Sequence, residues 1–207
     1  MRRTLRIFLS ALLLTALASS ISAQFRLFGP RSPRPTPQPK MRSASAYISR
    51  QPPLKVNQSV LRQATSDNVH VRVSLPRQRA YLMVGDQIAA DSPISSGKAG
   101  HSTPSGNFSV LEKDPDHRSS IYGDFVDGSG RVVRAGISAQ IDSAPSGTHY
   151  VGAPMTWFMR LTGEGVGMHV GILPGYPASH GCIRMPSDGA KLFYDTVRIG
   201  TPVSVGE

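Results

Sequence analysis

Residues 168–185, MHVGILPGYPASHGCIRM, hold Cys182, the only cysteine of the chain, and two of its six histidines, His169 and His180. A single cysteine cannot close a disulfide within its own chain. Its neighbours are glycine, serine, histidine and arginine, which is a poor setting for a packed core side chain. The stretch therefore predicts a reactive thiol, with Cys182 as nucleophile and His169 as its base.

Short strands are predicted on both sides of this stretch. Residues 157–161 and 166–170 form a predicted strand pair, and the second strand ends near His169. Far upstream, valine and leucine alternate with polar residues over 69–75, which is the two-residue period of a half-buried strand. Further strands are predicted at 78–84, 87–94, through Val110 and at 201–205.

The fold class that follows is mainly β. Glycine and proline turns separate the strands, so we expect a single domain of β-sandwich or barrel type over residues 67–207, with one or two short helices. One helix is predicted at 190–196, capped by Ser187 or Asp188. Residues 112–156 are polar and weakly periodic, and they predict long loops with one or two short strands near 132–137.

The first 23 residues resemble a secretory signal peptide. A basic head with Arg2, Arg3 and Arg6 precedes an apolar run over 7–18, and small residues end near Ala23. The apolar run is short for a bilayer span, although an uncleaved membrane anchor is the alternative. We expect an exported protein of the periplasm or cell envelope, where a lone thiol is exposed to oxidation.

The net charge of +10 has an uneven distribution. Residues 24–66 are rich in proline and hold eight basic residues and no acidic one, so they predict a disordered basic linker. Residues 67–207 hold 12 basic and 13 acidic residues, which removes the main argument for nucleic-acid binding. The basic linker either makes peripheral contact with an anionic envelope surface or is a solvated spacer.

The residues around the thiol can be given separate roles. His169 is the preferred base because a separate strand fixes its position better than the loop that carries His180. Gly181 allows a sharp turn, and its N–H together with that of Cys182 is expected to form an oxyanion hole. Arg184 offers a forked donor set suited to a substrate carboxylate, while an ordinary surface ion pair is the alternative.

The segment from His169 through Ser179-His180-Gly181-Cys182 to Met185 closely resembles the catalytic signature of the YkuD-type L,D-transpeptidases. Residues 103–108 resemble the Thr-Pro-x-Gly-x-Phe turn of the family, and 154–160 resemble the segment that leads to the catalytic histidine. The resemblance covers roughly residues 67–205. It implies a β-rich fold and cysteine acyl transfer on peptidoglycan stem peptides.

By this resemblance, Cys182 attacks the third residue of a tetrapeptide, usually a diamino acid, expels the terminal D-alanine and forms a thioester. His169 takes the thiol proton and later activates the acceptor amine. Ser179 and His180 shape the site, and Arg184 stands where the family has Asn or Arg. The resemblance implies no cofactor, a role in peptidoglycan synthesis, cell wall biogenesis and cell shape, and an acceptor lipoprotein as one partner.

Other readings of the same residues stay open. His169, His180 and Cys182 have ligand types suited to zinc, but the paired motifs of zinc sites are absent, so we expect no metal. A papain-like hydrolase normally has its cysteine before its histidine, the reverse of the order here. The remaining alternatives are a peptidoglycan L,D-carboxypeptidase or endopeptidase that uses the same Cys-His pair, and a non-catalytic wall-binding module.

Overall fold

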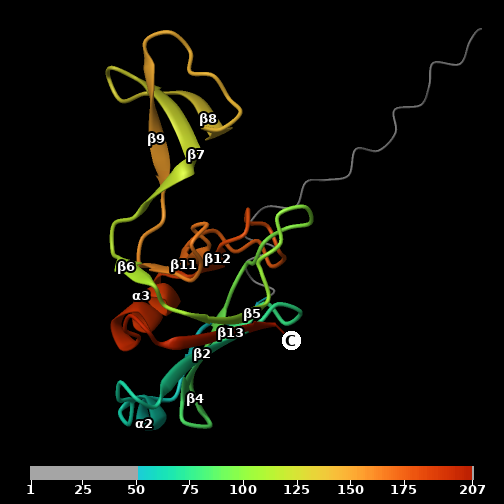
Figure 1. Ribbon diagram of the computed structural model, residues 1–207, viewed down its shortest axis with the longest axis vertical. Coiled ribbons are helices and arrows are strands. Elements are labelled where there is room, and N and C mark those ends of the chain that lie inside the picture. Colours follow the sequence, from blue (N-terminus) through green and yellow to red (C-terminus); the bar gives the residue numbers. More distant parts are fainter. Residues whose placement is uncertain (1–50, 207) are drawn as a thin grey trace, which may run out of the picture. The chain divides into compact units, whose positions relative to one another are not determined.

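A computed structural model describes residues 51–206, which form three β-sheets and two helices (Figure 1). The mainly β fold with one or two short helices is confirmed. None of the three sheets closes on itself, so the domain is not a barrel. No helix within residues 51–206 has the length and apolar character needed to cross a membrane.

The largest sheet follows from the alternation seen in the sequence. Val69, Val71 and Val73 are at most 5% exposed, while the residues between them lie on the other face. The strand that contains these valines pairs antiparallel with the next strand in the chain and parallel with the last strand. In spatial order the sheet contains β1 (Lys55–Val56), β4 (Gln87–Pro93), β3 (Arg79–Val84), β2 (Val69–Ser74), β13 (Pro202–Gly206) and β5 (Gly106–Ser109).

The second sheet carries the signature stretch. Its spatial order is β12 (Ile183–Met185), β11 (Gly167–Val170), β10 (Phe158–Arg160) and β6 (Glu112–Asp114). The predicted pair around residues 162–165 is present as β10 and β11, although Trp157 has a φ of 58° and lies outside the strand. The parallel pair of β11 and β12 places the two ends of the signature stretch side by side.

A third sheet corrects the prediction of long loops over 112–156. β7 (Arg118–Asp127) pairs with β8 (Val132–Ser138) on one side and β9 (Thr148–Pro154) on the other. Most side chains of this sheet are exposed or half-buried, so its sequence lacks an apolar alternation. The backbones of β7 and β9 approach each other so closely at Gly123 that this position requires glycine. A Cβ at Gly123 would lie 2.2 Å from the carbonyl oxygen of Val151.

Helix α3 (Ser187–Thr196) buries Gly189, Ala190 and Phe193 and contacts β11. The predicted side-chain cap is wrong: Pro186 occupies the N-cap position without a side-chain hydrogen bond. Pro186 needs no hydrogen-bond acceptor for its nitrogen, and its fixed φ suits a helix start. The helix joins a core with residues of the two larger sheets, among them Leu82, Ala90, Met168, Ile183 and Val203.

Folded structure begins before residue 67, which corrects the linker boundary. β1 pairs with β4, and α2 (Gln58–Leu61) starts at Asn57, whose side chain accepts a hydrogen bond from the Val60 N–H. Val60 is 5% exposed, so its burial fixes this short helix in the core. The rest of the predicted linker and the predicted signal peptide lie outside the described residues.

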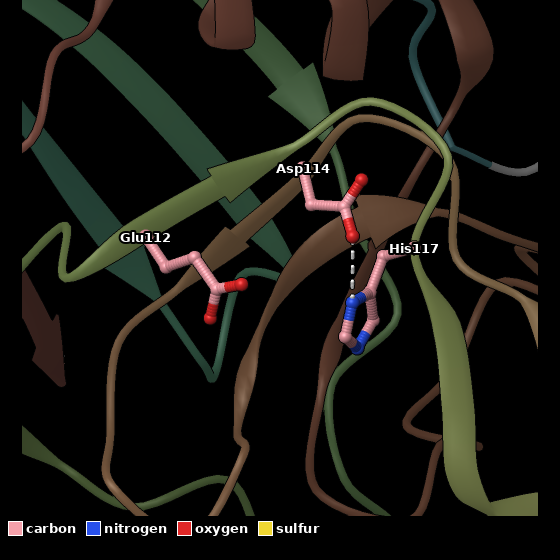
Figure 2. Close-up of side chains that lie close together, drawn as sticks. All are labelled: Glu112, Asp114 and His117. Atoms are coloured by element: carbon pink, nitrogen blue, oxygen red, sulfur yellow. Dashed lines mark hydrogen bonds and ion pairs between the residues drawn. The ribbon is translucent and has the colours of Figure 1, made fainter.

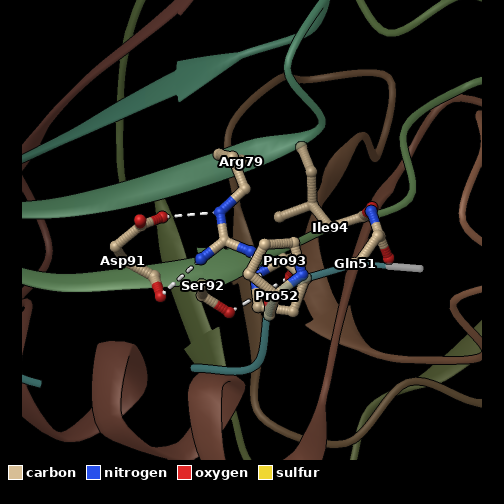
Figure 3. Close-up of polar contacts among 7 residues, drawn as sticks. All are labelled: Gln51, Pro52, Arg79, Asp91, Ser92, Pro93 and Ile94. Carbon is tan, nitrogen blue, oxygen red and sulfur yellow. Dashed lines mark hydrogen bonds and ion pairs between the residues drawn. The ribbon is translucent and has the colours of Figure 1, made fainter. Parts of the chain in front are cut away.

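One buried arginine ties the start of the described chain to the largest sheet. Arg79 is 7% exposed, and its Nε lies 2.6 Å from the Asp91 carboxylate. It also donates to the carbonyl oxygens of Pro52 (2.6 Å) and Asp91 (2.9 Å), as Figure 3 shows. The segment before β1 is therefore held by a hydrogen-bonded and partly buried charge pair.

Candidate active site

Five of the six predicted site residues line one cleft of about 890 Å³. The sixth, Gly181, lies between two of them in the chain but is not part of the lining. The wall also includes the start of β7, the segment between β9 and β10, and the turn between β10 and β11. The predicted residues that the cleft brings together are His169, Ser179, His180, Cys182 and Arg184.

Parallel strands position the thiol and the imidazole. His169 on β11 pairs with Arg184 on β12, and Met168 pairs with Ile183. Cys182 directly precedes β12, the strand next to the one that carries His169. Adjacent strands are about 4.8 Å apart, and His169 is level with Arg184, two residues after Cys182, so both side chains lie on the same face of the sheet.

His169 has a defined tautomer. It is 7% exposed, and its Nδ1 lies 2.7 Å from the carbonyl oxygen of Val170. A carbonyl only accepts, so Nδ1 donates its hydrogen and Nε2 keeps a free lone pair. Burial lowers the pKa of His169 from 6.5 to about 4, and the charges of Arg184 and His117 act in the same direction. At neutral pH the imidazole is an uncharged base.

The surroundings of Cys182 favour its protonated thiol form. Its Sγ lies 3.7 Å from the carbonyl oxygen of Gly165, and no hydrogen bond joins it to His169 within residues 51–206. Burial raises the pKa of Cys182, while the Gly167 backbone N–H and the charges of Arg184 and Arg160 oppose that rise. Thiol and imidazole are therefore a neutral pair at rest.

Hydrogen bonds around Gly181 correct one sequence expectation. The Gly181 N–H donates to Ser179 Oγ (3.1 Å), so it is not free for an oxyanion. Ser179 is 1% exposed, and its hydroxyl donates to the carbonyl oxygen of Cys182 at 2.5 Å. The Gly181 carbonyl accepts from the Thr103 hydroxyl (2.7 Å), which also accepts the Gly97 N–H. The turn is held from both sides, and the backbone N–H of Cys182 has no acceptor within residues 51–206.

His180 lies on the exposed side of the loop and contacts two rings. Tyr122 of β7 stacks on it with ring centroids 4.4 Å apart, and His101 meets it edge-on at 4.9 Å. Burial lowers the pKa of His180, and the charge of Lys98 adds to the effect. No sequence pattern indicates the Tyr122 contact, because the two residues are far apart in the chain and only Tyr122 lies on a strand.

Arg184 is a half-buried cation with no anionic partner within residues 51–206. Its side chain lies over Gly171, where a Cβ would come within 2.7 Å of the Arg184 Cγ. Burial lowers its pKa, and the nearby thiol of Cys182 opposes this. A desolvated guanidinium in a cleft is suited to a carboxylate of a bound molecule.

A cluster of three titratable side chains lies at the edge of the cleft. Glu112 and Asp114 of β6 and His117 place their ligand atoms within 4.8 Å of one another (Figure 2). Each is already engaged: Glu112 with Arg160 at 2.5 Å, and Asp114 with His117 Nδ1 at 3.1 Å. His117 also lines the cleft and stacks on Phe158 at 4.1 Å. The alternative zinc set of His169, His180 and Cys182 is not brought together in this way among residues 51–206.

Several solved L,D-transpeptidase structures are similar to this chain. Among solved structures, the chain is similar to an L,D-transpeptidase from Mycobacterium smegmatis, with 23% identity and a TM-score of 0.49 over 67% of this chain and 58% of that one. An L,D-transpeptidase in complex with imipenem gives 21% and 0.50 over the same shares. A mutant Enterococcus faecium L,D-transpeptidase gives 25% and 0.47 over 67% of this chain and 49% of that one.

The chain thus spans less than two thirds of these solved proteins, and the similarity with a TM-score of 0.50 supports a shared fold. No curated protein matches the chain. The model of the YkuD family, described as the L,D-transpeptidase catalytic domain, matches residues 68–205. This match covers most of the chain, including the cleft and both ends of the signature stretch. The chain therefore belongs to the YkuD family of L,D-transpeptidase catalytic domains.

Proposed function

We propose that this chain is an exported cysteine acyltransferase, an L,D-transpeptidase that acts on the tetrapeptide stems of peptidoglycan. One observation carries the proposal: a thiol and an uncharged imidazole with a free Nε2 line the same cleft, with His169 on β11 and Cys182 directly before the adjacent β12. Nucleophilic catalysis by cysteine needs this combination of a thiol and a base. The unpaired Arg184 in the same wall suits a peptide substrate that carries a free carboxylate.

Acylation begins when the Cys182 thiol turns from the Gly165 carbonyl towards His169. Nε2 takes the thiol proton while Sγ attacks the carbonyl carbon of the third stem residue. The Cys182 N–H, one of the two donors expected from the sequence, stabilises the resulting oxyanion. When the intermediate collapses, the carbon–nitrogen bond breaks, His169 returns its proton to the leaving amine, and D-alanine departs. The acyl group remains on Cys182 as a thioester.

Transfer follows the same geometry in reverse. An acceptor amine attacks the thioester carbonyl, and His169 takes a proton from the attacking nitrogen. The carbon–sulfur bond breaks, and the proton on His169 restores the Cys182 thiol. The product is a cross-link, an attached lipoprotein or an exchanged D-amino acid, according to the amine. Water in place of the amine makes the enzyme an L,D-carboxypeptidase or endopeptidase, which is the alternative function.

The two pKa shifts explain why the thiol and the imidazole are neutral before substrate binds. Burial raises the pKa of Cys182 and lowers that of His169, so a separated thiolate and imidazolium are disfavoured. Proton transfer then accompanies the attack. A resting thiol of this kind is protected from oxidation better than a permanent thiolate.

The proposed cellular setting rests on the sequence. Residues 1–23 act as the export signal, the basic residues that follow tether the enzyme near the envelope surface, and the domain that extends to residue 207 works on the cell wall in the periplasm. Its partners are peptidoglycan stem peptides and, for one class of acceptor, a lipoprotein.

Mass spectrometry tests the proposal directly. The chain is incubated with a disaccharide-tetrapeptide, and we expect loss of D-alanine together with an acyl adduct on Cys182. Cys182→Ala forms no adduct, and His169→Gln slows acylation by about 100-fold or more. His149→Gln, on the exposed side of β9, is the matched control and acylates like the wild type.

The products separate the two candidate reactions. A new amide identifies the transferase, whereas a free tripeptide identifies the hydrolase. A wild-type chain that binds the peptide but forms no adduct is a non-catalytic wall-binding module, and this result refutes both candidate reactions.

A further inference from the structure

Three histidines lie in the cleft wall among residues 51–206, and the proposed acylation uses only His169 as a base. Another of them, His117, follows β6 and directly precedes β7. Its side chain is 21% exposed, so its ring borders both the cleft and the solvent. A titratable group in this place is available for a second proton transfer.

The contacts of His117 orient its ring and leave one nitrogen open. Nδ1 lies 3.1 Å from Asp114 Oδ2. A carboxylate only accepts, so Nδ1 donates its hydrogen and Nε2 keeps a lone pair. Nε2 points away from Asp114 (Figure 2), and no hydrogen bond joins it to another residue within 51–206. The ring also stacks on Phe158 with centroids 4.1 Å apart. His117 and Asp114 together are an oriented base with one open position.

The two bases of the cleft wall are close together but differ in their surroundings. Phe158 contacts both rings, with its centroid 4.1 Å from that of His117 and 6.4 Å from that of His169. Burial is the main cause of the low pKa of His169, about 4, and the charge of His117 adds to it. His169 is therefore a weak acceptor for the proton of a cation. The carboxylate beside His117 stabilises a protonated imidazole instead.

Transfer to an amine releases more protons than His169 can take. A lysine-type amine is an ammonium ion at neutral pH, with three hydrogens on its nitrogen and no lone pair for attack. The new amide keeps one of these hydrogens, and the Cys182 thiol receives another through His169. Nδ1 of His169 is already engaged with the Val170 carbonyl, so this ring accepts one proton only. The remaining proton has to leave before the attack begins.

Two other groups of the cleft wall are weaker acceptors for that proton. The pKa of the Glu164 carboxyl is lowered, chiefly by a hydrogen bond from its own backbone N–H. Burial lowers the pKa of His180, and the charge of Lys98 adds to the effect. His180 also has no carboxylate partner within residues 51–206. His117 is the group whose partner favours the charged form.

We propose that His117, oriented by Asp114, is the base that removes the first proton from an acceptor ammonium group. Nε2 of His117 takes the proton, and the freed lone pair forms the carbon–nitrogen bond with the thioester carbonyl. His169 takes the second proton and passes it to sulfur as the carbon–sulfur bond breaks. His117 then returns its proton to water. This inference rests on the proposed acyl transfer and adds a base that the transfer step alone requires.

Two acceptors of different basicity test this role at pH 8. The full chain first forms its Cys182 adduct with the tetrapeptide and is then mixed with a large excess of either acceptor. The amine of glycinamide resembles an α-amino group and is about half uncharged at this pH, whereas only about 0.4% of the side-chain amine of Nα-acetyl-lysine is uncharged. Mass spectrometry follows the loss of the adduct and the growth of the new amide.

We expect His117→Gln to slow transfer to Nα-acetyl-lysine about 100-fold and transfer to glycinamide less than about fivefold. Adduct formation stays within about twofold of the wild-type rate, which also shows that the variant is folded. Asp114→Asn slows transfer to Nα-acetyl-lysine about tenfold. The matched control is Asp116→Asn, an exposed carboxylate of the same loop, which leaves both rates unchanged. Its backbone N–H donates to Asp114 at 3.0 Å, and asparagine keeps this bond.

The two acceptors distinguish proton removal from a general disturbance of the cleft. Equal slowing of both transfers in His117→Gln, or no slowing with Nα-acetyl-lysine, overturns the role of His117. Adduct formation that falls as far as transfer in both His117→Gln and Asp114→Asn also overturns it. A wild-type adduct that passes only to water refutes the assignment and leaves acylation standing. A wild type that forms no adduct refutes the proposed function itself, and the role of His117 falls with it.

Discussion

Protonation of His169 links acid pH to unfolding. The imidazole is buried, and its pKa is lowered from 6.5 to about 4, chiefly by that burial. Unfolding returns it to water, where it binds a proton below about pH 6.5. Between these two values the unfolded chain holds a proton that the folded chain does not. The contribution of His169 to stability is therefore complete above about pH 6.5 and is lost as the pH falls towards 4.

The size of this loss follows from the shift. Each pH unit between the two pKa values changes the free energy of unfolding by about 1.4 kcal/mol, so a fall from pH 7.5 to pH 4.5 removes about 2 to 3 kcal/mol through His169. His169→Gln has no titrating group at this position. Between pH 7.5 and pH 4.5, we therefore expect the free energy of unfolding of His169→Gln to fall by about 2 to 3 kcal/mol less than that of the wild type.

Urea unfolding at the two pH values measures the difference, with the fluorescence of Trp157, the only tryptophan of the chain, as the probe. Every other group titrates in both chains, so the difference between them isolates His169. His149→Gln, which changes an exposed histidine, loses as much stability as the wild type. If the wild type and His169→Gln lose the same amount, the imidazole is not held neutral by burial and the reasoning is wrong.

Three further substitutions test individual contacts. Tyr122→Ala removes the ring that stacks on His180, and we expect Cys182 acylation to slow about fivefold. Tyr122→Phe keeps the ring, so its acylation rate stays within about twofold of the wild-type rate in the same mass-spectrometric assay. Gly171→Ala displaces the Arg184 side chain, so KM for a donor with a free carboxylate rises several-fold, and an unchanged KM contradicts this. The free energy of unfolding in urea changes by less than about 1 kcal/mol. Arg79→Met breaks a buried charge pair and lowers the free energy of unfolding by about 2 kcal/mol, whereas the exposed Arg77→Met changes it by less than about 0.5 kcal/mol.

The parts of the fold that could be predicted are those with one buried face. Valines at alternate positions identified β2, because that strand packs one face on the core. β8 was predicted near 132–137, but β7 and β9 were missed because their sheet has no such face, and its glycines, such as Gly123, are required by backbone contacts that a sequence does not display. α2 was missed because four residues with one buried valine are too short to show a period.

The features of the site also divide into those that could be predicted from the sequence and those that could not. Residue types and spacing were enough to select Cys182, His169 and Arg184, which the structure brings to one cleft. The occupied N–H of Gly181 could not be foreseen, since it depends on the rotamer of Ser179. The stacking of Tyr122 on His180 joins two segments that are far apart in the chain, so no local sequence pattern predicts it.

The segment that contains β7, β8 and β9 enters and leaves the second sheet at adjacent points. The Met155 N–H donates to the His117 carbonyl at 2.8 Å, and the Trp157 N–H donates to the Pro115 carbonyl at 3.0 Å. Because these hydrogen bonds hold the two ends of the segment together, it can be exchanged for one of another length without moving the strands that flank it. Since its first residues form part of the cleft wall, grafting a different segment between His117 and Met155 changes which molecules reach Cys182 and leaves Cys182 and His169 in place.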